Sequence, residues 1–150
     1  MIPEGRRQKM ATVETYEFPD DLYYTREHVW ARVEGDVVTI GLSSFGQELA
    51  GKIVFVEAPR IGRTVAKDEP FMSMESGKWV GRVKAPVGGT IAAVNEELEW
   101  ESTIINLEPY AKGWLARIKA STLSDLNDLM RAGSPEFAAH LAAERAKYKK

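Results

Sequence analysis

From residue 23 onward the chain repeats one pattern, a short run of β-branched and aromatic residues followed by glycine or proline. Runs such as "HVWARV" and "VVTIGL" predict short strands, and Glu34-Gly35-Asp36 between these two predicts a hairpin turn. "KIVFVEAP" is apolar at most positions, which predicts a strand buried on both faces or in a sandwich core. Further strands are expected at 71–75, 79–85, 90–95 and 113–121. Six or more closely spaced short strands indicate a mainly β fold, an all-β sandwich or a flattened barrel.

Short helices are expected at two breaks in this strand pattern. Ser43 and Ser44 offer N-caps for a short helix near 43–50, and Gly51 suits its end. Residues 96–102 are acidic and are expected to form a helical or irregular excursion, whose carboxylates lie on a solvated face.

The composition changes twice along the chain and divides it into three parts. Residues 1–21 are polar and without periodicity, which predicts a flexible N-terminal arm. Residues 22–120 hold the strand pattern and are expected to form one domain. Residues 121–150 are expected to form C-terminal helices that pack on this domain or extend from it. Ser124 caps the first of them, and Ser134-Pro135 starts the second.

Charge and hydropathy exclude several classes of function. The 150 residues carry a formal net charge of -2, with acidic and basic side chains mixed along the chain, so no nucleic-acid interface is expected. No stretch approaches the roughly 20 consecutive apolar residues of a membrane span, and the N-terminus lacks the apolar core of a signal peptide. The sequence therefore predicts a cytoplasmic protein that does not enter a membrane.

The residues that usually bind metals or perform redox chemistry are scarce. The chain has no cysteine, which excludes disulfides, thiolate metal sites and a redox thiol of its own. His28 and His140 lie more than a hundred positions apart, and neither has the partner spacing of a metal site. They are expected to be a satisfied strand histidine and a solvated helix histidine. Any sulfur redox chemistry must come from a cofactor.

The segment "MESGKWVG" places a single lysine, Lys78, in a turn between two predicted strands. Ser76-Gly77 supplies the small residues of a tight reversal, and packing of the flanking strands is expected to hold Lys78 outward on a rigid support. Two interpretations stay open from these residues alone. The lysine is either an ordinary solvated turn residue or a site at which a carrier cofactor is attached covalently.

Several quoted segments, read together, resemble the H protein family of the glycine cleavage system. They are "HVWARVEGDVVTIGL", "GKIVFVEAP", "GRTVAKDEPFMSMESGK", "APVGGTIAAVNEEL" and "INLEPYAKGWLARIK", within residues 22–130. The family's "ESxK" turn and "PxxG" strand entry are both present. The resemblance implies a lipoyl/biotinyl-domain-like flattened β-barrel, or barrel-sandwich hybrid, with lipoate in amide linkage on Lys78. It also implies that Glu75 and Gly89 are cues for the lipoylating enzyme, a lipoate ligase or lipoyl transferase.

The sequence departs from the family pattern at positions around the expected arm. Members of the family usually have Glu where this chain has Val29, and Asp where it has Arg82. Both changes disfavour a cationic aminomethyl cargo. The "ESGKWVG" turn resembles instead that of the H-like lipoate-binding proteins of bacterial sulfur oxidation. That resemblance implies a sulfur-bound cargo, with Trp79 and Arg82 as possible contacts to the loaded arm.

The resemblance also implies which proteins would be the partners of this chain, and it leaves other interpretations to be weighed. The partners would be a heterodisulfide-reductase-like complex and dihydrolipoamide dehydrogenase, or alternatively the glycine cleavage components if the arm carries aminomethyl groups. A carrier that must visit several partners is expected to be a monomer and not itself an enzyme. A biotin carrier is disfavoured because Lys78 is not flanked by methionines. A scaffold or regulatory domain with an unmodified Lys78 is the remaining alternative.

Overall fold

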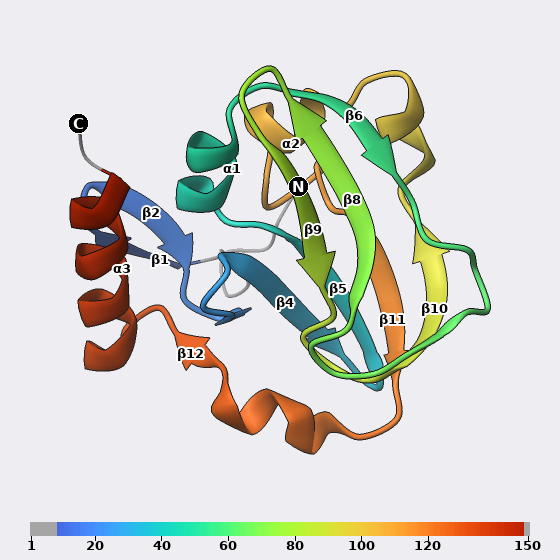
Figure 1. Ribbon diagram of the computed structural model, residues 1–150. Helices are drawn as coiled ribbons and strands as arrows, with labels where there is room; N and C mark the ends of the chain where they lie inside the picture. Colours follow the sequence, from blue (N-terminus) through green and yellow to red (C-terminus); the bar gives the residue numbers. More distant parts are fainter. Residues whose placement is uncertain (1–8, 149–150) are drawn as a thin grey trace.

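Two antiparallel sheets pack against each other in the computed structural model, which describes residues 9–148 (Figure 1). The larger sheet has the strand order β12-β3-β4-β5-β11-β10-β7. Its strands are, in chain order, β3 (Tyr23–Tyr24), β4 (Val29–Glu34), β5 (Val37–Leu42), β7 (Thr64–Val65), β10 (Gly89–Val94), β11 (Ala116–Ala120) and β12 (Met130–Arg131). The smaller sheet has the order β6-β8-β9, formed by β6 (Ile53–Glu57), β8 (Pro70–Ser76) and β9 (Val80–Lys84).

The main core lies between these two sheets. Ile40, Ile91 and Ile118 contribute from the larger sheet, and Ile53 and Met74 from the smaller one, and all five side chains are fully buried. Burying one such side chain stabilises a fold by about 1.5–3 kcal/mol. The mainly β prediction is therefore confirmed, and the core fixes the smaller sheet on the larger one.

Short helical segments lie together at one end of the two sheets, and two of them occur where the sequence predicts them (Figure 1). Helix α1 (Ser44–Ala50) begins after Ser43, whose hydroxyl accepts a hydrogen bond from the Gly46 amide at 3.1 Å. The acidic excursion is a 3₁₀ turn, η2 (Glu96–Glu99), followed by α2 (Ile104–Leu107). No helix within residues 9–148 is both long enough and apolar enough to cross a bilayer.

The prediction of a flexible arm is wrong for residues 9–21, the part of the arm that the structure describes. β1 (Met10–Val13) and β2 (Tyr16–Pro19) form an antiparallel hairpin, while residues 1–8 of the predicted arm lie outside the described residues. Phe18 of this hairpin is fully buried and meets Phe137 edge to face, with ring centroids 4.9 Å apart. The aromatic partner lies more than a hundred positions away, so local polarity alone gave no sign of the packing.

The C-terminal region differs from its prediction in one respect. The helix expected after Ser124 is instead a 3₁₀ segment, η3 (Leu123–Asp128), which is capped by Thr122 and followed after one residue by β12. The final helix α3 (Pro135–Tyr148) begins as predicted, since the Ser134 hydroxyl accepts a hydrogen bond from the Phe137 amide. Phe137 and Leu141 bury one side of α3 against a second core cluster that contains Phe18, Tyr24 and Trp30.

The segment "KIVFVEAP" forms a strand that contributes Ile53 to the sandwich core, one of the two predicted alternatives, and it is not buried on both faces. β6 is an outer strand of the smaller sheet, and Val54 and Phe55 are 60% and 51% exposed. A shift of register between Ile53 and Phe55 turns two consecutive side chains outward. Apolar composition therefore overstated the burial of this strand.

Gly89→Ala should destabilise the fold by about 1–3 kcal/mol, because an added Cβ would collide with the carbonyl oxygen of Lys119 on the paired strand. Urea unfolding followed by circular dichroism measures the change. Gly133→Ala is the matched control, since nothing lies within 4 Å of its added Cβ. Equal midpoints for the two variants would contradict the packing role of Gly89.

Candidate functional site

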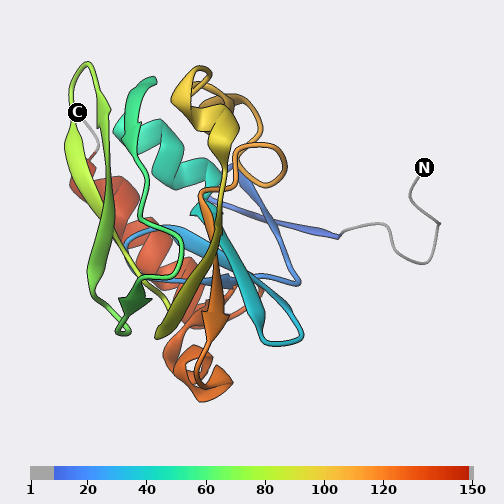
Figure 2. The same cartoon turned by 90° about the vertical axis from the view of Figure 1, so that its right-hand side faces the viewer.

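Lys78 lies exposed at the tip of the hairpin formed by β8 and β9. The Ser76 amide donates a hydrogen bond to the Trp79 carbonyl at 2.7 Å, which closes a tight four-residue turn. Figure 2 shows this hairpin with its tip at one end of the molecule. The predicted turn is therefore present, and it presents the lysine to solvent.

The Ser76 side chain ties this turn to the end of α1. Its hydroxyl donates a hydrogen bond to the carbonyl of Ala50, the last residue of the helix, and accepts one from the Lys78 amide at 3.2 Å. One hydroxyl thus satisfies a helix-end carbonyl and fixes the turn residue that follows. The position of Lys78 is set by two elements and not by the hairpin alone.

The segment that receives this contact is itself held by Asn106 from α2. The Asn106 side-chain amide donates to the Gly51 carbonyl at 2.8 Å, and its oxygen accepts from the Ile53 amide at 2.9 Å. Gly51 has φ of 86°, a conformation that favours glycine. A Cβ added to Gly51 would lie 2.8 Å from Lys78 Cε, so the lysine chain crosses the helix end where a side chain is missing.

A cleft of about 600 Å³ opens beside the hairpin, between β9, α1 and α3. Val29, Ala50 and Trp79 give it an apolar wall. The Trp79 indole lies across Gly81, where an added Cβ would collide with the ring. The Lys78 side chain crosses Gly51, next to the lining residue Ala50, so a group attached to the lysine begins near the rim of this cleft. An exposed amine next to a half-apolar cleft fits a flexible carrier cofactor.

The charges that line the cleft are mainly positive. Arg26, Arg82, Lys84 and Lys147 face it, against the carboxylates of Glu27 and Glu144. Val29, where the family usually has a glutamate, is buried and adds no charge. Val29 and Arg82, the two departures from the family pattern, therefore both line this cleft.

The structure brings together some of the predicted site residues and separates others. Trp79 and Arg82 line the cleft next to Lys78. Glu75 is exposed at the end of β8, in register with Val80 across the hairpin. Gly89 is buried at the start of β10, after the whole length of β9, and pairs with Ala120. Its surroundings are those of a packing position, and its part in lipoylation stays a prediction.

The two histidines that the sequence left as unrelated converge at the far wall of the cleft. His28 Nε2 lies 3.0 Å from Glu144 Oε1, and the His28 and His140 rings stack with centroids 5.6 Å apart. Burial lowers the pKa of His28, and its hydrogen bond with Glu144 opposes this effect. The expectation that neither histidine has a partner at metal-site spacing was therefore wrong for His140, since Glu144 lies at i+4 on the same helix, and this spacing was the sequence signal that could have found the cluster.

A small two-sheet barrel that presents one lysine on a hairpin tip beside a cleft defines a class of protein, the carrier domain that bears its cofactor covalently. The family model described as "Glycine cleavage H-protein" matches residues 22–140. The glycine cleavage system H proteins of Brevibacillus brevis and Halalkalibacterium halodurans are 45% and 46% identical to this chain. Their alignments cover 80% and 76% of it and 95% and 89% of the relatives.

A solved structure agrees with these sequence matches. The crystal structure of a glycine cleavage system H protein from Mycobacterium marinum superposes with a TM-score of 0.74 at 30% identity. It covers 83% of this chain and 99% of that one. The chain belongs to the glycine cleavage H-protein family. The predicted lipoyl-domain-like fold, the covalent lipoate cofactor and the non-catalytic carrier role are thereby confirmed.

Ser76→Ala should lower the free energy of unfolding by about 1–3 kcal/mol, because it leaves the Ala50 carbonyl and the Lys78 amide without their partner. Urea unfolding midpoints measure the loss. Ser73→Ala on the same strand removes only an exposed contact with Glu57, and it should stay within about 0.5 kcal/mol of the parent. A Ser76→Ala protein as stable as the Ser73→Ala protein would show that the bridge to α1 is dispensable.

Proposed function

We propose that Lys78 is the residue that carries lipoate, in amide linkage to its Nζ. The proposal is supported by the turn "ESGK", by the exposure of the side chain and by the rigid support that Ser76 provides. Glu75, exposed three residues earlier, is a contact for the lipoate ligase or lipoyl transferase that must recognise this hairpin tip. The single observation that carries the proposal is the anchored turn with its free amine.

When attached, lipoate supplies a dithiolane that accepts a group on one sulfur and is later reoxidised by thiol–disulfide exchange. The polypeptide positions and shelters the group. Gly51 leaves space for the lysine chain to bend toward the cleft, and Trp79 covers an apolar part of its wall. Val29 and Leu49 complete a surface from which water is partly excluded.

For the cargo, we infer that the arm carries an aminomethyl group between the components of the glycine cleavage system, which are then its partners. The support is the 43–46% identity to relatives named glycine cleavage system H proteins, over nearly their whole length. The predicted role in sulfur oxidation, with a heterodisulfide-reductase-like complex, receives no support from these comparisons. The aminomethyl alternative is the better supported of the two.

One specific observation keeps a sulfur-bound cargo as a second candidate. Basic side chains, among them Arg82, Lys84 and Lys147, outnumber the two carboxylates that line the cleft, whereas a methylammonium group would be stabilised by carboxylates. Two like charges 4 Å apart repel by about 1 kcal/mol in water and by about 4 kcal/mol at an effective dielectric of 20. The same cations would attract an anionic sulfur cargo. In that case the partners are the heterodisulfide-reductase-like complex and dihydrolipoamide dehydrogenase.

Lys78→Arg should abolish lipoylation. A lipoate ligase forms an amide with the neutral amine of a lysine, and the guanidinium of arginine cannot take its place. Intact-mass spectrometry after incubation with ligase, lipoate and ATP measures the result. Lys84→Arg is the control, since this lysine lies at the other end of β9 and should leave one lipoyl group per chain. A lipoylated Lys78→Arg protein would place the attachment elsewhere, and an unmodified parent protein would favour the scaffold interpretation.

The cargo is tested by glycine–bicarbonate exchange with the pyridoxal-phosphate decarboxylase of the glycine cleavage system. The lipoylated parent should support exchange, and Arg82→Asp should raise its efficiency by about fivefold, the equivalent of about 1 kcal/mol at an exposed site. A Val29→Glu, Arg82→Asp double variant should raise it further.

Lys119→Asp makes the same change of charge on the exposed face of β11 and should leave the rate unchanged. If the lipoylated parent is inactive and only the Arg82 variants support exchange, the aminomethyl proposal fails and the sulfur cargo is favoured. Equal exchange rates for the parent and all of these variants would instead contradict the argument that the charge of Arg82 disfavours an aminomethyl cargo.

A further inference from the structure

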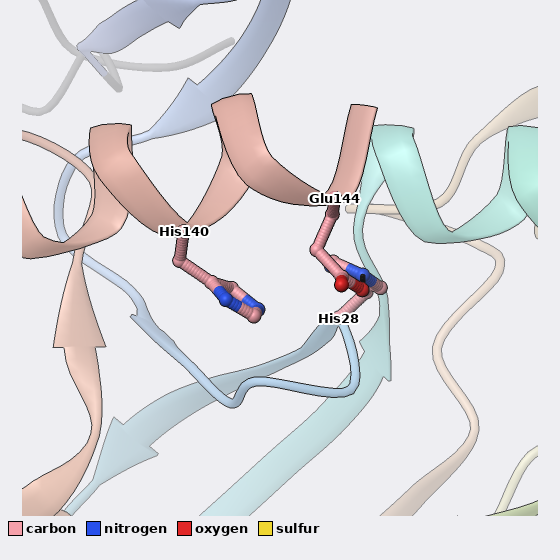
Figure 3. Close-up of side chains that lie close together, drawn as sticks. All are labelled: His28, His140 and Glu144. Atoms are coloured by element: carbon pink, nitrogen blue, oxygen red, sulfur yellow. Dashed lines mark hydrogen bonds and ion pairs between the residues drawn. The ribbon is translucent and has the colours of Figure 1, made fainter. Parts of the chain in front are cut away.

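Three side chains with metal-binding atoms meet where α3 crosses the loop before β4 (Figure 3). His140 and Glu144 come from successive turns of α3, and His28 comes from the loop. Figure 3 shows the three side chains pointing toward one another. One donor atom from each lies within 4.8 Å of the other two, and His28 Nε2 is already 3.0 Å from Glu144 Oε1. The meeting of these three side chains is not needed for the turn that presents Lys78 or for the packing of the two sheets.

The hydrogen bond of His140 determines which of its ring nitrogens is free. Its Nε2 lies 2.8 Å from the carbonyl oxygen of Arg26, and a carbonyl can only accept, so Nε2 carries the proton. In a neutral ring the lone pair is then on Nδ1. A histidine that donates one ring N–H to a backbone carbonyl and offers the other nitrogen is arranged like those that bind metals, because the outer bond fixes ring and tautomer.

His28 is held in place from its backbone outward. Its amide donates to the Thr25 carbonyl, and its carbonyl accepts from the Ser43 amide at 2.9 Å. The residue has φ of 71°, an uncommon conformation for a side chain of this size. Gly46 makes the position possible, because a Cβ there would lie 2.8 Å from the Cβ of His28. The buried imidazole can therefore move little, whereas His140 and Glu144 are partly exposed and can adjust.

We propose that His28, His140 and Glu144 form a binding site for a divalent transition-metal ion, with Zn²⁺ as the best match to the two imidazoles and one carboxylate. Zn²⁺ binds imidazole nitrogen and carboxylate oxygen at about 2.0–2.2 Å, which puts tetrahedral donors about 3.4 Å apart. The 3.0 Å between His28 Nε2 and Glu144 Oε1 is close to this spacing, and the His140 donor, within 4.8 Å of the other two, has to approach by up to about 1.4 Å. On binding, the metal replaces the Nε2 proton of His28, which moves to Nδ1 of the same ring.

The surroundings leave a fourth coordination position accessible. All three donors line the cleft beside the hairpin, so water or another ligand can reach a metal there. The site would add a metal-mediated link between α3 and the loop before β4, which are also joined by the His28–Glu144 and His140–Arg26 hydrogen bonds and the exposed Arg26–Glu136 ion pair. The inference does not depend on the cargo or on the attachment of lipoate.

The test is a titration of the full-length, tag-free protein with ZnCl₂ after treatment with a chelator, followed by calorimetry. One equivalent should bind and raise the melting temperature. Glu144→Gln, which retains a hydrogen-bonding partner for His28, and His140→Ala should each raise the dissociation constant at least tenfold. CoCl₂ gives an independent readout, since the visible absorption of tetrahedral Co²⁺ should appear in the parent and vanish in both variants.

Glu136→Gln on the same helix is the matched control and should bind as the parent does, because Glu136 forms an exposed ion pair with Arg26 and is not one of the three proposed ligands. Both test variants change partly exposed residues, so they should remain folded, and their circular dichroism verifies this. A parent protein that binds no zinc, or that binds it no more tightly than Glu144→Gln and His140→Ala do, would overturn the proposal.

Discussion

The hydroxyl of Ser76 makes the contact on which the functional end of this protein depends. It donates a hydrogen bond to the last carbonyl of α1, and it also accepts one from the amide of Lys78. Without it the lysine would sit on a two-stranded tip with only its own turn to hold it. With it, the lysine that we propose as the lipoylation site has a backbone fixed by two elements, while its side chain extends into solvent.

The rest of the architecture holds these two elements in place. The core between the sheets fixes β8 through Met74, and Asn106 holds the residues after α1 by hydrogen bonds to both sides of the segment. A second cluster of aromatic side chains joins the N-terminal hairpin and α3 to the opposite side of α1. The cleft is bounded by α1 on one side and α3 on another, so its shape depends on both clusters.

Features that arise from neighbouring residues could be predicted from the sequence, and features that arise from distant pairs could not. The Lys78 turn, the Ser43 cap and the start of α3 each depend on a few adjacent residues, and all three are present. The buried hairpin around Phe18 and the meeting of His28 with Glu144 depend on partners over a hundred positions away. The exposure of β6 depends on its place at the outside of a sheet, which composition does not encode.

The place of β9 at the outside of the smaller sheet has a consequence for association. An outer strand offers unpaired backbone groups on which a strand of another molecule can add, and exposed basic side chains are a common way to discourage this. Arg82 and Lys84 are two such side chains on β9. The same two basic side chains that line the cleft therefore also protect the free edge of the hairpin from edge-to-edge aggregation.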